Sequence, residues 1–186
     1  MGLYFMLEII HNDHRNINQL LRILRNKIKL LENDEGIDYR LVKAIINYLR
    51  CYSDKYHHPM EDLIYAYYLK YRVVPDEVAT RLYNEHKLIK EVTIELDELV
   101  EMILLDAIVP KQQCLEKLSV FVELQAAHLM YEESQIIPAI RESLSADDWS
   151  NLAQQWQHNH YDDPLFGDNI AEEYKGLAER INQNSF

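Results

Sequence analysis

The chain has 186 residues, of which 48% are hydrophobic and 27% are charged, and this composition suits a soluble protein of one domain or one domain with an appendage. Four glycines and five prolines are few, which argues against a sheet with many tight turns and for long helices. The net charge of −12 repels phosphate groups, so we expect neither nucleic acids nor anionic membranes as partners.

The two cysteines and the N-terminal residues indicate the cellular compartment of the protein. Cys51 and Cys114 have neither disulfide-framework nor metal-ligand spacing, which favours a reduced, cytoplasmic setting. Both lie in apolar helical stretches, so we expect both in the core. Residues 1–10 are apolar, but they have no basic start and include Glu8, so we interpret them neither as a signal peptide nor as a membrane span.

Two long helices are predicted in the first part of the chain. Apolar residues three and four positions apart predict a helix over about residues 10–32. The same spacing predicts a second helix over about residues 38–72. Pro59 lies inside this second helix and lacks a backbone donor, so we expect a kink near His57 and His58.

The rest of the chain predicts two more long helices and two short ones. A helix starts at Val74-Pro75-Asp76-Glu77, where proline suits the first turn and the acids favour the positive end of the helix dipole, and it runs to about residue 108. The fourth long helix covers about residues 110–144, with Pro138 bending its last turns. Shorter helices are predicted over about residues 147–157 and 169–182.

Short links between long helices force neighbours to run antiparallel. The sequence therefore predicts an all-α fold, an up-down-up-down four-helix bundle with two short C-terminal helices packed on it. We place the bundle at residues 1–144 and the C-terminal extension at residues 145–186.

Each long helix carries at least one histidine on or beside its apolar stripe, and two of them carry a glutamate four residues later. The residues concerned are His14, His57, His58, Glu61, His86, His128 and Glu132. Residues four apart on a helix point the same way, with Cβ atoms about 5–6 Å apart. A rise of about 1.5 Å per residue puts the histidines of the antiparallel helices at a similar level.

Buried carboxylates need a counter-charge, and a pair of metal ions supplies one. The sequence therefore predicts a metal site with two ions inside the bundle. A nitrogen-rich, oxygen-bridged donor set favours iron over calcium or magnesium, and the lack of thiolates argues against structural zinc.

These residues resemble the hemerythrin-like (HHE) cation-binding domain over about residues 10–144. The runs that carry the resemblance are His14, Tyr56-His57-His58-Pro59-Met60-Glu61-Asp62, Glu85-His86 and His128-Leu129-Met130-Tyr131-Glu132-Glu133. A further run, Asp163-Pro164-Leu165-Phe166-Gly167, is similar to a tail of some bacterial members.

The resemblance implies two iron ions (Fe2+/Fe3+) in a carboxylate-bridged pair. It assigns the bridging role to Glu61 and Glu132. It implies that His14 and His57 face one iron, whereas three further histidines face the other. Those three are His58, His86 and His128.

The chain departs from the oxygen-carrying members at one point and leaves alternatives at two others. Their third helix offers a second histidine where this chain has Lys90, so His58, a water molecule or an open position takes its place. Glu133 is an alternative to Glu132 as a bridge, and Asp62 is an alternative to Glu61.

Other side chains have weaker assignments. His11 is interpreted as an exposed residue at the helix start, with a place at the mouth of the site as the alternative. Tyr65, one turn past Glu61, is either a packing residue or a phenol close to a metal ligand. We expect His158 and His160 at the surface. Trp149 and Trp156 are expected to pin the C-terminal extension onto the bundle.

Three functions fit the sequence. The first is a di-iron protein that reversibly binds oxygen or nitric oxide for sensing, storage or stress response; the resemblance links the histidine-rich shell to binding more than to catalysis. The second is an oxygen- or peroxide-activating enzyme, or a factor that donates iron to damaged metal centres. The third is a metal-free helical interaction module. A ferritin-like site ranks low, because the only Glu-x-x-His spacing is Glu8 with His11. A homodimer is left open.

Overall fold

The computed structural model describes residues 5–71, 76–156 and 162–183, and every regular element in these ranges is helical. The α-helices are α1 (Phe5–Glu32), α2 (Tyr39–Tyr52), α3 (His58–Tyr71), α4 (Asp76–Leu104), α5 (Lys111–Tyr131), α6 (Ile137–Ser143), α7 (Ala146–Trp156) and α8 (Lys175–Gln183). Two π-helical turns, η1 (Ser53–His57) and η2 (Glu132–Ile136), and a 3-10 turn, η3 (Glu172–Tyr174), lie between them.

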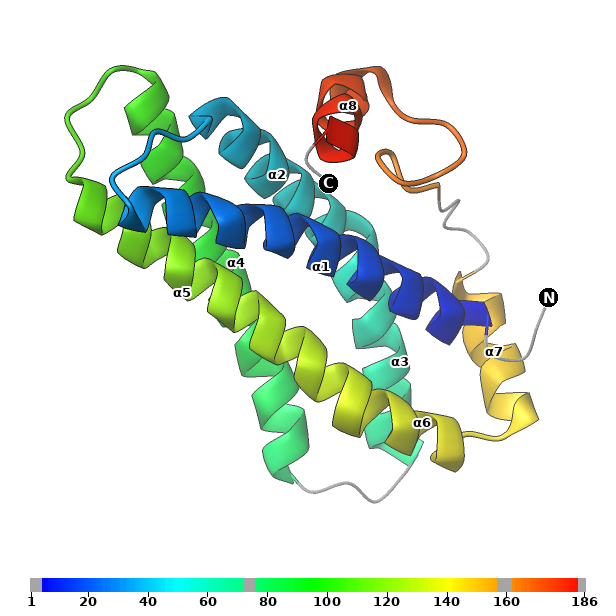
Figure 1. Ribbon diagram of the computed structural model, residues 1–186. Coiled ribbons are helices and arrows are strands. Elements are labelled where there is room, and N and C mark those ends of the chain that lie inside the picture. Colours follow the sequence, from blue (N-terminus) through cyan, green and yellow to red (C-terminus); the bar gives the residue numbers. More distant parts are fainter. Residues whose placement is uncertain (1–4, 72–75, 157–161, 184–186) are drawn as a thin grey trace.

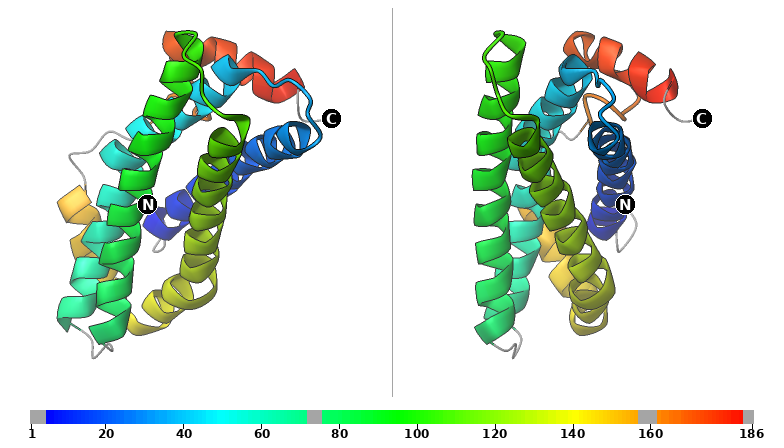
Figure 2. Two further views of the ribbon diagram at one scale, coloured as in Figure 1. Left: turned by 90° about the vertical axis from the view of Figure 1, so that its left-hand side faces the viewer. Right: turned by 60° about the vertical axis from the view of Figure 1, so that its left-hand side comes forward.

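The long helices form an antiparallel bundle (Figure 1). The chain runs along α1, back along α2 and α3, forward along α4, and back along α5 and α6. Around the bundle, α1 contacts α5, α5 contacts α4, α4 contacts α2, and α1 contacts α2 and α3. The C-terminal helices pack outside, with α7 against α3 and α8 against α2 (Figures 1 and 2). The predicted all-α four-helix bundle with two short helices packed on it is confirmed, and its division at residues 144 and 145 stays a prediction.

Two of the long segments change helix type next to a proline. In η1 the His58 N–H donates to the carbonyl of Ser53, five residues earlier, and η2 has the same kind of bond. The next residue, Pro59 or Pro138, has no N–H for the carbonyl four residues before it, and the chain widens to the five-residue spacing. The irregularity predicted near His57 is therefore a π-helical turn.

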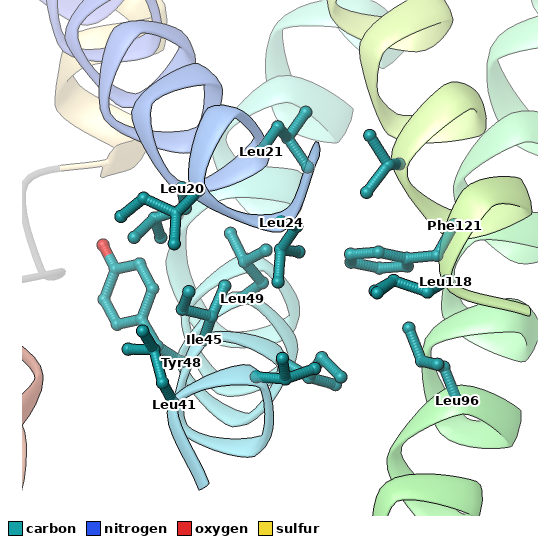
Figure 3. Close-up of a cluster of buried hydrophobic side chains, with 14 of the residues drawn as sticks. Leu20, Leu21, Leu24, Leu41, Ile45, Tyr48, Leu49, Leu96, Leu118 and Phe121 are labelled. Atoms are coloured by element: carbon teal, nitrogen blue, oxygen red, sulfur yellow. The ribbon is translucent and has the colours of Figure 1, made fainter. Parts of the chain in front are cut away.

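Two apolar clusters fill the bundle and leave a polar layer between them. The first apolar cluster joins α1, α2, α4 and α5, and Figure 3 shows its centre, with Leu20, Leu24, Ile45, Leu96, Leu118 and Phe121 turned towards one another. The second apolar cluster joins the start of α1 to α3, α6 and α7, and it includes Met6, Ile10, Ile64, Ile136 and Leu152. Buried aliphatic side chains contribute about 1.5–3 kcal/mol each to folding. The apolar clusters on the two sides of the polar layer therefore hold its helices in place.

Two buried tryptophans attach the C-terminal extension, and the two cysteines differ in exposure. Trp149 and Trp156 are buried in the second apolar cluster, as expected for residues that pin α7 to the bundle. Cys114 is buried as expected, but Cys51 is exposed, because the next residue, Tyr52, takes the core-facing position on α2. His158 and His160 lie outside the described residues. Among the described helices, none has the length and apolar character that a membrane span requires.

Candidate metal centre

Side chains from all four long segments meet in the polar layer between the two apolar clusters. Two groups have ligand atoms within 4.8 Å of one another: His14, His57 and Glu61, and His58, Glu61, His86 and His128. Because Glu61 belongs to both groups, the two lie side by side rather than apart. The predicted histidines of each helix therefore converge at one level of the bundle.

Glu61 sits between the two groups and is 0% exposed. Its Oε1 lies 3.1 Å from His14 Nε2 and 3.4 Å from His57 Nε2. Its Oε2 lies 3.5 Å from His86 Nε2, in the other group. One carboxylate thus presents one oxygen to each set of histidines.

Glu132 lies in the same layer and is also 0% exposed. Its Oε2 lies 3.3 Å from His128 Nε2 and 3.4 Å from His14 Nε2, so this oxygen also touches both groups. Its Oε1 lies 3.7 Å from His86 Nε2 and accepts a 2.7 Å hydrogen bond from the Tyr65 hydroxyl. Tyr65 therefore contacts a predicted ligand directly, which was one of the two alternatives for this residue.

Four histidines have a second carboxylate on their outer ring nitrogen. His57 Nδ1 lies 3.2 Å from Asp13 Oδ2, and His14 Nδ1 lies 2.7 Å from Glu133 Oε1. A carboxylate acceptor at Nδ1 favours the tautomer with its proton there and leaves Nε2 free to face a metal. These contacts orient the first two histidines inward.

His86 and His128 also have a carboxylate at Nδ1. His86 Nδ1 lies 3.1 Å from Asp62 Oδ1, and His128 Nδ1 lies 2.9 Å from Glu85 Oε2. Glu85 is itself held by Arg81, whose Nε donates to Glu85 Oε1 at 2.6 Å. We call the four acids Asp13, Asp62, Glu85 and Glu133 the outer carboxylates.

The structure separates the acids that the sequence left as alternatives. Glu133 is 32% exposed at its side chain and contacts the outer nitrogens of His14 and His11, whereas Glu132 is fully buried among the inner nitrogens. Asp62 is 66% exposed and lies on the outer nitrogen of His86. Both alternatives therefore contact the Nδ1 atoms of histidines. His11, 56% exposed, lies at the rim beside Glu133.

His58 differs from the other histidines of the layer. It is 9% exposed, and its ring stacks on His86 with centroids 4.3 Å apart. Burial, together with the neighbouring rings of His86 and His57, lowers the pKa of His58 well below its ordinary value. A neutral imidazole is the form that binds metal, so His58 is suited to complete the second group.

Buried atoms in the layer lack hydrogen-bond partners within the described chain. They are Glu61 Oε2, Glu132 Oε2, His86 Nε2 and His128 Nε2. His86 Nε2 lies 3.5 Å from Glu61 Oε2, and His128 Nε2 lies 3.3 Å from Glu132 Oε2. Buried polar atoms are nearly always paired, because leaving one unpaired costs roughly 1–3 kcal/mol. Nitrogen and carboxylate oxygen are iron ligands, so a pair of cations would satisfy these atoms together.

The charge balance of the layer agrees with this fit. Burial opposes the protonation of His14 and His86, but hydrogen bonds to nearby carboxylates raise the pKa of His14 well above its ordinary value and that of His86 to about 12. Burial would also raise the pKa of Glu61, yet the neighbouring His57 and His14 hold it well below its ordinary value. The raised pKa values of His14 and His86 favour protons that offset the buried acids in the metal-free chain, and a bound cation would take over this role.

Outer carboxylates such as Asp13 and Glu85 were not assigned from the sequence. Each outer carboxylate is next to a predicted ligand in the sequence, and this adjacency is the feature from which its role could have been predicted. Its partner is a histidine of another helix, however, and spacing along one helix does not report contacts between helices.

One pocket reaches the predicted ligands. It has a volume of about 260 Å³, and His58 and His86 are among its lining residues, together with Tyr83 and Lys87. A larger pocket of about 510 Å³ has His11, Glu133, Ile137 and Arg141 among its lining residues. Lys90, at the position where a second histidine was expected by resemblance, pairs with Asp54 at 3.1 Å and is exposed.

Comparison with known protein families matches residues 6–140 to the hemerythrin HHE cation binding domain. The match spans most of the chain and includes every residue of the two histidine and glutamate groups. Among curated proteins, no match is found.

Proposed function

This chain belongs to the hemerythrin HHE cation-binding domain family, and on that premise we propose that it binds two iron ions and, reversibly, a small diatomic ligand. Oxygen and nitric oxide are the ligands we propose, for sensing, storage or stress response in a reducing, cytoplasmic setting. When bound, an iron pair would supply the redox chemistry that reversible binding of such ligands needs. The residues of the chain fix the position, charge and access of that pair.

The observation that carries the proposal is the shared position of the two buried glutamates. Glu61 and Glu132 are both 0% exposed, and each has oxygen atoms near histidines of both groups. We assign both as bridges. We assign His14 and His57 to one iron, and the remaining three histidines to the other. Those three are His58, His86 and His128.

Access supports a small ligand at the second iron. The 260 Å³ pocket reaches His58 and His86, the two more exposed histidines of the layer. The first group is covered by buried Asp13 and by Glu133 on the outer nitrogens of its histidines. A diatomic molecule entering from this pocket would meet the iron held by His58 and His86 first.

The test is metal content together with the optical spectrum. We expect protein reconstituted without oxygen to hold two iron ions per chain and to gain visible absorption with oxygen or nitric oxide, with reversal when the gas is removed. The Glu61→Gln variant should lose both iron and absorption. Glu95→Gln is the control, because Glu95 is exposed on α4 and pairs with Lys117. Iron well below one per chain, or no spectral change with either gas, would contradict the proposal.

A second candidate is an enzyme that activates oxygen or peroxide. The observation that favours it is the Tyr65 hydroxyl, 2.7 Å from Glu132 Oε1, which places a proton donor beside the centre. Repeated turnover of peroxide by iron-loaded protein, with a lower rate in Tyr65→Phe at unchanged iron content, would support this function. Complete inertness towards oxidants would count against it, and against iron donation as well if no iron is transferred to an acceptor protein.

A further inference from the structure

Two buried tyrosines on α2 lead away from the centre. Tyr52 and Tyr48 are 2% and 1% exposed, and their rings are stacked, with centroids 5.2 Å apart and planes at 13°. The Tyr52 hydroxyl donates to Asp13 Oδ1 at 2.9 Å, and Asp13 Oδ2 lies 3.2 Å from His57 Nδ1. The first ring is thus one carboxylate away from a proposed iron ligand.

The second ring has a carboxylate of its own, supplied by the C-terminal segment. The Tyr48 hydroxyl lies 2.9 and 3.0 Å from the two oxygens of Asp163, which is 6% exposed. The backbone N–H groups of Leu165 and Phe166 donate to the same carboxylate at 2.8 and 3.0 Å and fix its position. In Figure 3 the Tyr48 oxygen lies at the edge of the first apolar cluster and points away from Phe121.

The tight loop that holds Asp163 depends on a glycine. A Cβ at Gly167 would lie 2.4 Å from the Asp163 carbonyl oxygen, closer than atoms can approach. Beyond the loop, the Tyr174 ring lies 5.4 Å from the Tyr48 ring and is half-buried. A series of aromatic rings therefore connects the centre with the molecular surface beside α8.

We propose that Tyr52 and Tyr48 conduct single electrons between the metal centre and the face covered by the C-terminal segment. The inference rests on the proposed function, since it requires bound iron. A tyrosine loses an electron most easily when its phenolic proton has an acceptor, because the cationic phenol is a strong acid. Each of these two phenols has a buried carboxylate at 2.9 Å, and the stacked rings provide the contact for transfer.

Hydrogen peroxide is the oxidant for this step. Bound iron would supply the site at which peroxide reacts. Peroxide takes two electrons and two solvent protons, its O–O bond breaks, and two water molecules form. One electron comes from Tyr52, whose phenolic proton passes to Asp13. The other comes from Tyr48 by way of Tyr52, and its proton passes to Asp163. Two phenoxyl radicals remain, and a one-electron donor such as a thiol or ascorbate reduces them at the surface.

The test is electron paramagnetic resonance of iron-loaded protein frozen at short times after mixing with peroxide. We expect a tyrosyl radical whose spectrum narrows when the tyrosines are deuterated. Tyr52→Phe should lower its yield at least tenfold, and Tyr48→Phe should lower it about twofold. Phenylalanine keeps each ring and removes only the hydroxyl. Tyr67→Phe is the matched control. The Tyr67 hydroxyl also donates to an aspartate, Asp148, at 2.7 Å, but Tyr67 lies on α3 and is not part of the stacked pair.

Several outcomes would overturn the proposed electron path through Tyr52 and Tyr48. A radical yield that Tyr52→Phe leaves unchanged would do so, as would a radical that Tyr65→Phe alone removes. Iron content and the nitric oxide spectrum are measured on every sample. Normal iron and nitric oxide binding without a tyrosyl radical would refute the electron path and leave the proposed function standing. Failure to bind iron would refute both.

Discussion

Each outer carboxylate neighbours a proposed ligand in sequence and contacts the histidine of the next helical segment. Asp13 of α1 reaches His57, Asp62 of α3 reaches His86, Glu85 of α4 reaches His128, and Glu133 of η2 returns to His14. The contacts thus form a closed ring around the bundle. The ring explains how four flexible imidazoles hold their inner nitrogens at one level, because each ring orientation is fixed from a neighbouring helix.

Removing one member of the ring should loosen metal binding without removing a ligand. We expect Glu85→Gln to weaken iron affinity by about 10- to 100-fold, because His128 loses a charged acceptor at Nδ1. Competition with a chelator measures this affinity. Glu91→Gln is the control, since Glu91 is exposed on the same helix and lies 3.9 Å from Lys87. Equal affinities of the two variants would show that the outer carboxylates do not tune the centre.

The two adjacent glutamates at the start of η2 should behave differently. Glu132→Gln is expected to lose the bridged pair of ions, because Glu132 is buried among inner nitrogens of both groups. Glu133→Gln should keep two ions with weaker affinity, because it touches only outer nitrogens. Iron per chain, determined by elemental analysis, separates the two. The reverse ranking would make Glu133 the bridge.

At the level of helices, the sequence predicted the four long segments and the level at which the histidines meet, because both follow from spacing along single helices. Two starts were wrong: α1 begins at Phe5 rather than near residue 10, and α8 begins at Lys175 rather than near residue 169. The π-helical turns were not predicted as such. Pro59 and Pro138 indicated a disturbance, but the choice between a kink and a wider turn depends on packing against the neighbouring helices. The partners of Asp13 and Glu85 were missed for the same reason, since contacts between helices leave no period in the sequence.

Asp38 links two elements through one side chain. Its Oδ1 accepts from the backbone N–H groups of Arg40 and Leu41 at the start of α2, and its Oδ2 lies 3.0 Å from Arg180 of α8. We expect Asp38→Ala to lower the free energy of unfolding by about 1 kcal/mol, measured by denaturant melts. Asp38→Asn should lose much less, because it keeps the cap and the exposed ion pair contributes little. Equal losses would assign the effect to the ion pair.

At the scale of the whole molecule, the polar layer lies between two apolar clusters and divides the core. Without a cation, burying Glu61 and Glu132 is tolerable only because protons are held on His14 and His86. Metal binding and folding should therefore be coupled, and the stability that the ions add should grow with their affinity and concentration. The iron-loaded protein should consequently lose less stability than the metal-free protein as pH rises.

In the metal-free protein, His14 and His86 have pKa values raised above the ordinary 6.5. Above pH 6.5 the folded chain then holds more protons than the unfolded chain, so its stability should fall as pH rises. Metal binding requires the deprotonated nitrogens, so the stability added by iron should increase as pH rises above 6.5. Thermal melts with and without iron measure both trends. A Glu61→Gln, Glu132→Gln double variant should show no iron effect, and parallel pH slopes of the two wild-type forms would refute the coupling.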